Sequence, residues 1–150
     1  RSKVDVPIIA AGGMVDGGTM AAAFALGAEG IQMGTRMVSA LESPVHQNWK
    51  QAIVDAPETG TVFLNKFHSP ALRALRTERT SRLEANAADN IMPEFGDAQA
   101  LYFGGDMEAA IPLSGQVAGR IESIKPVADI LHETRDEFFR ILESLQRQYL

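Results

Sequence analysis

The sequence contains no cysteine, which excludes disulfide bonds, thiolate metal sites and cysteine nucleophiles from these 150 residues. It also lacks an uninterrupted apolar run of about 20 residues, the length that a membrane-spanning helix needs. A basic surplus is missing as well: the formal net charge is −5, whereas nucleic acids and anionic membranes require a basic surface. These absences favour a cytoplasmic protein with a small-molecule partner, and neither a nucleic acid nor a membrane is expected as a partner.

The clearest pattern that is present lies near the N-terminal end of the chain. A short apolar run at 7–11 has no helical spacing and suits a strand that is buried on both faces, as in a parallel sheet. Asp16 or Thr19 then provides an N-cap for a helix that ends at Gly27. A second short apolar run at 29–33 completes a strand, helix and strand unit.

Both strands of this unit end in glycine-marked turns. Gly12 and Gly13 follow the first strand, and Gly34 and Thr35 follow the second. Because parallel strands joined by one helix end at the same edge of a sheet, we expect the two turns to lie side by side. Glycines let backbone N–H groups approach an anion closely, and the Thr35 hydroxyl can donate one more hydrogen bond. The turns predict a phosphate site, although the same glycines also suit two tight turns without a ligand.

The stretch "VPIIAAGGMVDGGTMAAAFALGAEGIQMGTR", followed by "ESPVHQNWKQAI", resembles the C-terminal part of the nitronate monooxygenase family, formerly called 2-nitropropane dioxygenases. "IPLSGQVAGRI" and the helix after it resemble the end of the same family. The resemblance implies an FMN-dependent flavoprotein in which Gly12, Gly13, Gly34 and Thr35 bind the FMN phosphate. Flavin-dependent enoyl-acyl-carrier-protein reductases and some NADH:quinone reductases share the pattern. An oxidase of alkyl nitronates that uses O2 and a reductase that uses NAD(P)H therefore both stay open.

The fold that this resemblance implies is α/β, as the C-terminal part of a (β/α)8 TIM barrel. Residues 1–56 would hold its last two βα units, residues 57–110 a mostly helical covering domain, and residues 111–150 a return segment and a C-terminal helix on the barrel. A whole barrel needs roughly 250 residues, and the loops after its strands 7 and 8 commonly bind phosphate. We therefore expect the C-terminal portion of a longer enzyme. The non-enzyme alternative is a fragment that keeps only the phosphate-binding turns.

The middle of the chain supports weaker predictions. Pro44 is expected in the first turn of a helix that ends near Ala56. The run at 61–67 predicts a strand or a crossover without a hairpin partner. The next segment predicts a helix on which arginines recur at every third residue: Arg73, Arg76, Arg79 and Arg82. This stripe is either a solvated face or a site for a phosphate-bearing cofactor or acyl carrier, with Arg73 as the first candidate.

The C-terminal segment predicts a turn at Ser114 and Gly115 that leads into a short helix. The resemblance places this turn near the mouth of the active site, which makes Ser114 and Gln116 candidate pocket residues; a helix N-cap explains Ser114 equally well. Pro126 opens a last helix with an apolar stripe that docks on the barrel exterior or forms a homodimer contact.

No catalytic residue is identified. His46, His68 and His132 are the candidates for a general base, because histidine titrates near neutral pH, and only His68 lies in a loop that could face a pocket. No two carboxylates have a spacing that supports acid–base catalysis, and no cluster of histidine, aspartate and glutamate has the spacing of metal ligands. By resemblance, the catalytic histidine of the family lies in an earlier segment that this sequence does not contain. The sequence therefore predicts a site that binds FMN and leaves the base unknown.

Overall fold

The computed structural model describes residues 3–86 and 88–150. Its strands form a parallel pair and an antiparallel pair. The elements in chain order are β1 (Ile9–Ala11), α1 (Gly17–Ala25), β2 (Gly30–Gln32), α2 (Thr35–Val38), α3 (Gln47–Val54), β3 (Thr61–Leu64), β4 (Leu72–Leu75), α4 (Glu78–Ala85), η1 (Met92–Glu94), α5 (Ala98–Tyr102), η2 (Gln116–Arg120) and α6 (Val127–Tyr149).

The N-terminal unit is the predicted strand, helix and strand. β1 pairs with β2 in parallel, from Ile9 opposite Gly30 to the last pair, Ala11 opposite Gln32. The connecting helix α1 begins at a capping box, in which the Asp16 carboxylate accepts a hydrogen bond of 2.7 Å from the backbone N–H of Thr19. These features confirm the prediction made from hydrophobic spacing and cap residues.

The burial predicted for the first strand is wrong for this chain. The Ile9 side chain is 57% exposed, although it belongs to an apolar run typical of strands that are covered on both faces. The physical reason is that β1 pairs only with β2 among the described strands, so the sheet is two strands wide and α1 covers one of its faces.

The segment at 61–75 forms an antiparallel hairpin, with Phe63 opposite Arg73 in its register. The prediction that the strand at 61–67 lacks a hairpin partner is wrong, and so is the prediction of one helix through all four arginines. Leu72 and Ala74 alternate toward the core, which is the period of a strand, and helix α4 begins only after Thr77, whose side chain caps it. The arginines therefore lie on different elements and form no common stripe.

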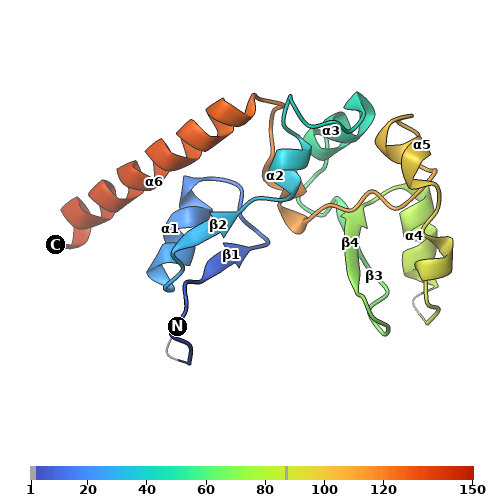
Figure 1. Cartoon of the computed structure of the whole chain (residues 1–150), viewed down its shortest axis with the longest axis horizontal. Helices are drawn as coiled ribbons and strands as arrows, with labels where there is room; N and C mark the ends of the chain where they lie inside the picture. Colours follow the sequence, from blue (N-terminus) through green and yellow to red (C-terminus); the bar gives the residue numbers. More distant parts are fainter. Residues whose placement is uncertain (1–2, 87) are drawn as a thin grey trace.

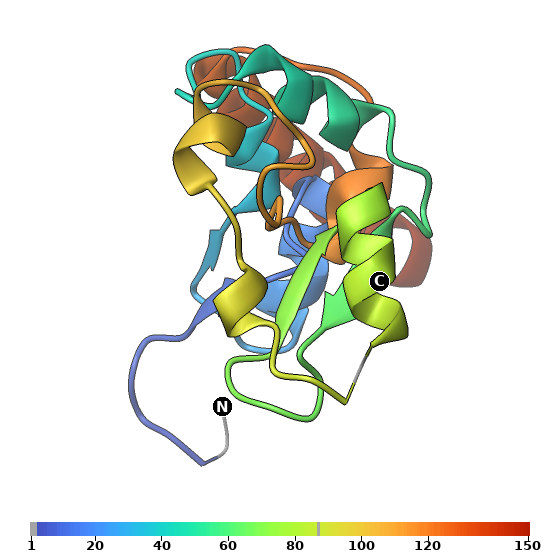
Figure 2. The same ribbon diagram turned by 90° about the vertical axis from the view of Figure 1, so that its right-hand side faces the viewer.

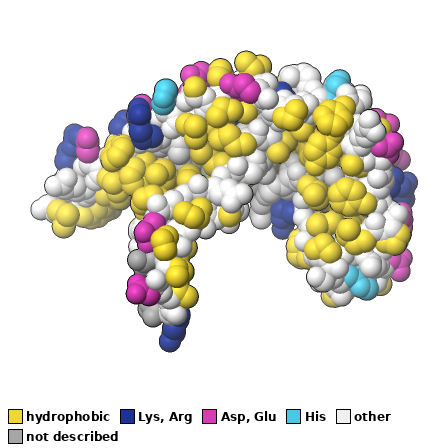
Figure 3. Space-filling view, viewed as in Figure 1, with side chains coloured by type: hydrophobic (Ala, Val, Ile, Leu, Met, Phe, Trp, Pro, Cys, Tyr) yellow, Lys and Arg dark blue, Asp and Glu magenta, His cyan; other side chains and the backbone are white. Residues whose placement is uncertain are grey.

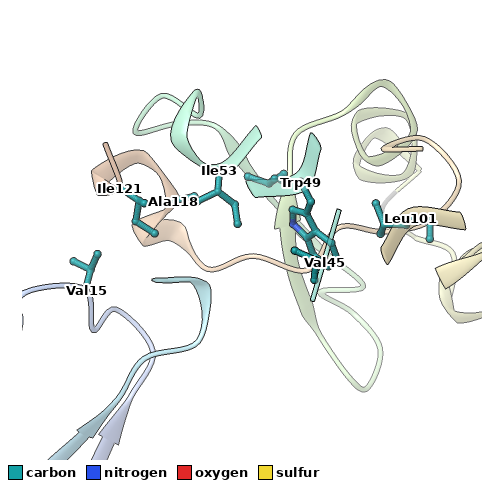
Figure 4. Close-up of a cluster of buried hydrophobic side chains, with 9 residues drawn as sticks. Val15, Val45, Trp49, Ile53, Leu101, Ala118 and Ile121 are labelled. Atoms are coloured by element: carbon teal, nitrogen blue, oxygen red, sulfur yellow. The ribbon is translucent and has the colours of Figure 1, made fainter. Parts of the chain in front are cut away.

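Two clusters of buried side chains hold the chain together. One lies under α4 and is formed by Val62, Leu64, Ala74, Leu83, Ile91 and Ile111. The other joins α3 to α5 and η2; Figure 4 shows Trp49 and Ile53 of α3 between Ala118 and Leu101. Helix α3 begins at Gln47, capped by the His46 side chain, so Pro44 lies before the helix and not in its first turn as predicted.

Helix α6 is the predicted C-terminal helix, and it packs along α1. The rings of Phe24 and Phe138 meet edge to face with centroids 5.1 Å apart. Ile130 and Phe138 are buried, while Leu142 and Tyr149 of the same apolar stripe are 42% and 70% exposed. Within residues 3–86 and 88–150, no helix combines the length and the apolar character needed to cross a membrane.

The elements are arranged around an open hollow. In Figure 1, β1, β2 and α1 lie on one side, the hairpin and α4 lie on the other side, and α2 and α3 connect them. Figure 3 shows the surface hollowed between these two parts. Figure 2, viewed from the side of the hairpin, shows α4 close to it. The ends of β1 and β2 run toward this central region.

Candidate phosphate site

The two glycine-marked turns lie at one edge of the parallel sheet. Since Ala11 and Gln32 form its last pair, the chain leaves both strands at the same end, as predicted. Gly12 and Gly13 have φ values of 83° and 77°, in the left-handed region that glycine adopts without a steric cost. The turn after β1 therefore requires both of its glycines for its backbone shape.

Gly34 has a different reason to be glycine. Its φ is −90° and its ψ is −78°, so the backbone there accepts any residue without left-handed strain. A Cβ atom added to Gly34 would have no protein atom within 4 Å, and the same holds at Gly12 and Gly13. Neither backbone conformation nor protein packing thus requires a glycine at position 34. The space in front of it is open, which is what an approaching anion needs.

Thr35 carries the hydrogen-bonding groups of the second turn. Its Oγ1 accepts a hydrogen bond of 2.7 Å from the backbone N–H of Gly115, which leaves the hydroxyl hydrogen free to donate. In the described part of the chain, the backbone N–H groups of Thr35 and Arg36 donate to no protein acceptor, as is usual for the first residues of a helix. The turn can therefore offer an anion several donors.

Arg36, the next residue, anchors the turn through its buried side chain. Its guanidinium is buried and donates to Ser39 Oγ at 2.9 Å and to the Ser123 carbonyl at 3.0 Å. Burial lowers the pKa of Arg36 from its ordinary value, and the carboxylate of Glu133 opposes this shift. This arginine serves to anchor α2 to the segment before α6.

Ser114 is buried and contacts both α3 and β4. Its hydroxyl lies 3.4 Å from the donating Nε1 of Trp49, and its backbone N–H donates to the Arg73 carbonyl at 3.1 Å. The predicted short helix is confirmed by η2, whereas Ser114 and Gly115 form no turn and Gly115 is extended. Gly115 is the N-cap residue of η2, and no side chain caps it. The N-cap role considered for Ser114 is therefore wrong, because its hydroxyl faces Trp49.

Gln116 is exposed and lies beside the first turn. A cleft of about 400 Å³ is lined by Gly13, Glu58, Gln116, Val117, Gly119 and Arg120. The structure thus brings the turn after β1 together with the return segment, over 100 residues apart in the sequence. Glu58 and Arg120 were not among the predicted residues. The segments of Glu58 and Arg120 meet at Gly119, where an added Cβ atom would lie 2.5 Å from the Cα of Glu58. This glycine was the one sequence signal for the position of Glu58.

The three histidines lie elsewhere. His46 caps α3, His132 is exposed on α6, and the exposed His68 makes a hydrogen bond of 2.9 Å with the Ala88 carbonyl. None of the three lines the cleft that holds Gly13 and Gln116. Over the ranges 3–86 and 88–150, no group of three or more histidine, aspartate or glutamate side chains could hold a metal ion.

Comparison with known proteins finds a matching family and several relatives. A family model described as nitronate monooxygenase matches residues 1–137. A probable nitronate monooxygenase of Staphylococcus saprophyticus is 36% identical over 93 residues, which cover 62% of this chain and 26% of that protein. Another, from Staphylococcus aureus, is 31% identical over 146 residues, 93% of this chain and 41% of that protein.

Two solved structures share the fold of the chain. The structure of FabK from Thermotoga maritima superimposes with a TM-score of 0.91 and 40% identity, over 99% of this chain and 49% of that one. A nitroalkane oxidase from Streptomyces ansochromogenes gives a TM-score of 0.78 and 27% identity, over 97% of this chain and 43% of that one. The chain therefore spans less than half the length of each of these four relatives.

Proposed function

The chain belongs to the nitronate monooxygenase family, a family of oxidoreductases, and we propose that it forms the end of an FMN-dependent enzyme that holds the flavin phosphate. The observation that carries this proposal is the open space in front of Gly34. Neither the backbone conformation nor protein packing requires a glycine there. Gly12, Gly13, Gly34 and Thr35 would surround the phosphate from two neighbouring turns. Their backbone N–H groups and the Thr35 hydroxyl would donate to its oxygens.

We place this segment as the last two βα units of a TIM barrel, residues 1–56. The supporting observations are the parallel pairing of β1 and β2 through α1, the exposed side chain of Ile9, and the similarity to chains about twice as long. Residues 57–110, with the hairpin, α4 and α5, would cover the flavin. Residues 111–150 would return to the barrel, with α6 packed on its exterior.

When bound, FMN supplies the redox chemistry, while the protein positions it and its substrate. In this chain, the bond between Gly115 and Thr35 fixes the return segment at the phosphate edge. Gln116 then extends from the same segment into the cleft beside Gly13, where its amide can contact the flavin or the substrate. Ser114, buried against Trp49, orients this segment and would line the pocket with its backbone.

The reaction that we propose for the complete enzyme is the oxidation of alkyl nitronates by O2. This proposal is supported by the matching family model and by the names of the Staphylococcus relatives. The catalytic base is not assigned to any residue of this chain.

A second candidate is an enoyl-acyl-carrier-protein or quinone reductase that takes electrons from NAD(P)H. The observation that favours it is the similarity to FabK, whose 40% identity over 99% of the chain exceeds that of the Staphylococcus aureus relative. The two candidates differ in their electron donor, which would be the nitronate in the first reaction and NAD(P)H in the second.

Anaerobic stopped-flow mixing of the complete enzyme with each donor tests the two candidates. Rapid bleaching of the oxidised flavin by a nitronate, and its slow bleaching by NADH and NADPH, is the result expected for a nitronate monooxygenase. Rapid bleaching by NADH or NADPH alone would support the reductase. The fragment alternative is tested on the 150-residue chain itself, because a chain that binds no FMN lacks part of the cofactor site.

A further inference from the structure

The β3–β4 hairpin has one covered face and a second face that is open at Phe63 and Arg73. Val62, Leu64 and Ala74 point into the cluster under α4. Because side chains alternate along a strand, Phe63 and Arg73 point to the opposite face, where the register places them directly across from each other. Helix α4 lies on the far side of the hairpin from β1 and β2, so this open face looks toward the hollow (Figures 1 and 3).

Arg73 is held in a defined position on this face. Its guanidinium carbon lies 5.5 Å from the centroid of the Phe63 ring, and its Nη1 donates to Thr61 Oγ1 at 3.0 Å. Thr61 is buried, and Phe63 is 43% exposed. The half-buried arginine is therefore oriented by two neighbours, and these contacts leave most of its five N–H donors available.

Arg73 also lacks the acidic partner that Arg76 and Arg120 have. Arg76 pairs with Glu84 at 3.0 Å, and Arg120 pairs with Asp16. Among the residues that the structure describes, no carboxylate pairs with Arg73, in a chain whose formal net charge is −5. Arg73 is thus an oriented cation without an acidic partner, beside the exposed ring of Phe63. Such a pair is suited to a ligand that carries an anionic group next to an apolar group.

Arg73 is linked to the candidate phosphate site through two hydrogen bonds. The Arg73 carbonyl accepts from the backbone N–H of Ser114, and the next N–H, that of Gly115, donates to Thr35 Oγ1. The open face of the hairpin and the turn after β2 therefore flank the same short segment. A molecule that reaches the flavin from the hollow would pass this face.

We propose that Phe63 and Arg73 bind a phosphate ester of the second substrate, with the guanidinium on the phosphate and the ring against the apolar group beside it. This inference rests on the proposed FMN site and on the reductase candidate, because neither an alkyl nitronate nor O2 carries a phosphate ester. The phosphate ester belongs either to a nicotinamide dinucleotide or to a 4′-phosphopantetheine arm, since both carry a phosphate next to a less polar group.

The test is a titration of the 150-residue chain, observed by ¹H–¹⁵N NMR in the presence of FMN. The probes are NADPH, NADH, 4′-phosphopantetheine and inorganic phosphate. We expect saturable shifts at Phe63 and Arg73 with at least one organic probe, and that probe identifies the source of the phosphate. Arg73→Gln should weaken its binding about tenfold or more, the effect of losing a charged hydrogen bond, and Arg73→Lys should weaken it less. Phe63→Leu should also weaken it, since the flat ring is lost.

Arg82→Gln is the matched control, because Arg82 is exposed on α4, away from the open face, and its replacement changes the net charge equally. The inference is overturned if no probe gives saturable shifts in the parent chain, or if Arg73→Gln and Arg82→Gln weaken binding alike. Spectra without ligand report whether each variant is folded. FMN titrations of the same samples separate the two proposals: unchanged FMN binding without probe binding refutes only this inference, and probe binding without FMN binding refutes only the proposed function.

Discussion

The backbone N–H of Gly115 donates a hydrogen bond of 2.7 Å to the hydroxyl oxygen of Thr35, which lies 80 residues earlier in the sequence. A Cβ atom on Gly115 would lie 3.1 Å from the same oxygen, so a side chain there would crowd the bond. This contact fixes the return segment against the turn after β2. It also uses only the acceptor side of the hydroxyl, which leaves its hydrogen to donate to a phosphate.

Replacing Thr35 by valine should therefore lower both stability and FMN affinity. The Gly115 N–H loses its acceptor, which costs about 1–3 kcal/mol in a partly buried position, and the phosphate loses a donor. Urea unfolding and FMN titration measure the two effects. Thr35→Ser is the control, because it keeps the hydroxyl; equal losses in the serine and valine variants would contradict the assigned role.

Gly34→Val should weaken FMN binding by about tenfold or more without unfolding the chain, because the side chain enters the space assigned to the phosphate. The φ of −90° and the absence of any protein atom within 4 Å of the added Cβ leave no steric reason for a loss of stability. Fluorescence quenching of FMN measures the affinity. Ala25→Val, at the exposed end of α1, is the control. Equal affinity in the two variants would remove Gly34 from the site.

The two turns should respond differently to alanine. Gly13→Ala should lower the free energy of unfolding by about 1–2 kcal/mol, because a Cβ atom is strained at a φ of 77°. Gly34→Ala should change it by less than about 0.5 kcal/mol, as at an unstrained exposed position. Chemical denaturation of both variants tests this difference, and a similar cost at both positions would mean that the turn after β2 is also strained.

The strand, helix and strand unit was predictable because its signals are local. Hydrophobic spacing, the Asp16 cap and the glycine turns all lie within 30 residues, and each agrees with the others. The strand β4 was missed for an equally local reason. The arginine spacing is also that of a helix, while the competing alternation of Leu72 and Ala74 lies in a strand of only four residues. Its pairing with β3 decides the conformation, and sequence periodicity does not contain that contact.

The assembly of the site depended on long-range contacts that the sequence does not encode in any pattern. The bond between Thr35 and Gly115 and the meeting of Gly13 with Gln116 both join the two ends of the chain. The resemblance to a known family pointed to these residues, whereas spacing alone did not bring them together. The open position at Gly34 became informative only when its φ was known, because a glycine in a sequence does not reveal whether the backbone requires it.

The contact between α1 and α6 gives a further prediction, on stability. A Cβ atom on Gly17 would lie 2.7 Å from the Thr134 carbonyl oxygen, so Gly17→Ala should push the helices apart and cost about 1–3 kcal/mol. This exceeds the roughly 0.5–1 kcal/mol that alanine gains over glycine inside a helix.

Gly18→Ala is the matched control for Gly17, because its Cβ would meet its nearest atom at 3.4 Å, an ordinary contact distance. We expect that variant to be as stable as the parent chain or slightly more stable. Thermal unfolding of the two variants measures the difference. A stabilised Gly17→Ala variant would show that α6 does not pack on α1 as closely as described.

The turns after β1 and β2 are proposed to bind the phosphate of FMN. Parallel titrations of the 150-residue chain with FMN and with riboflavin, which lacks only the phosphate, test this proposal most directly. We predict that FMN binds at least about tenfold more tightly than riboflavin, because charged hydrogen bonds to the phosphate add to its affinity. Equal affinities for the two flavins would contradict the phosphate site.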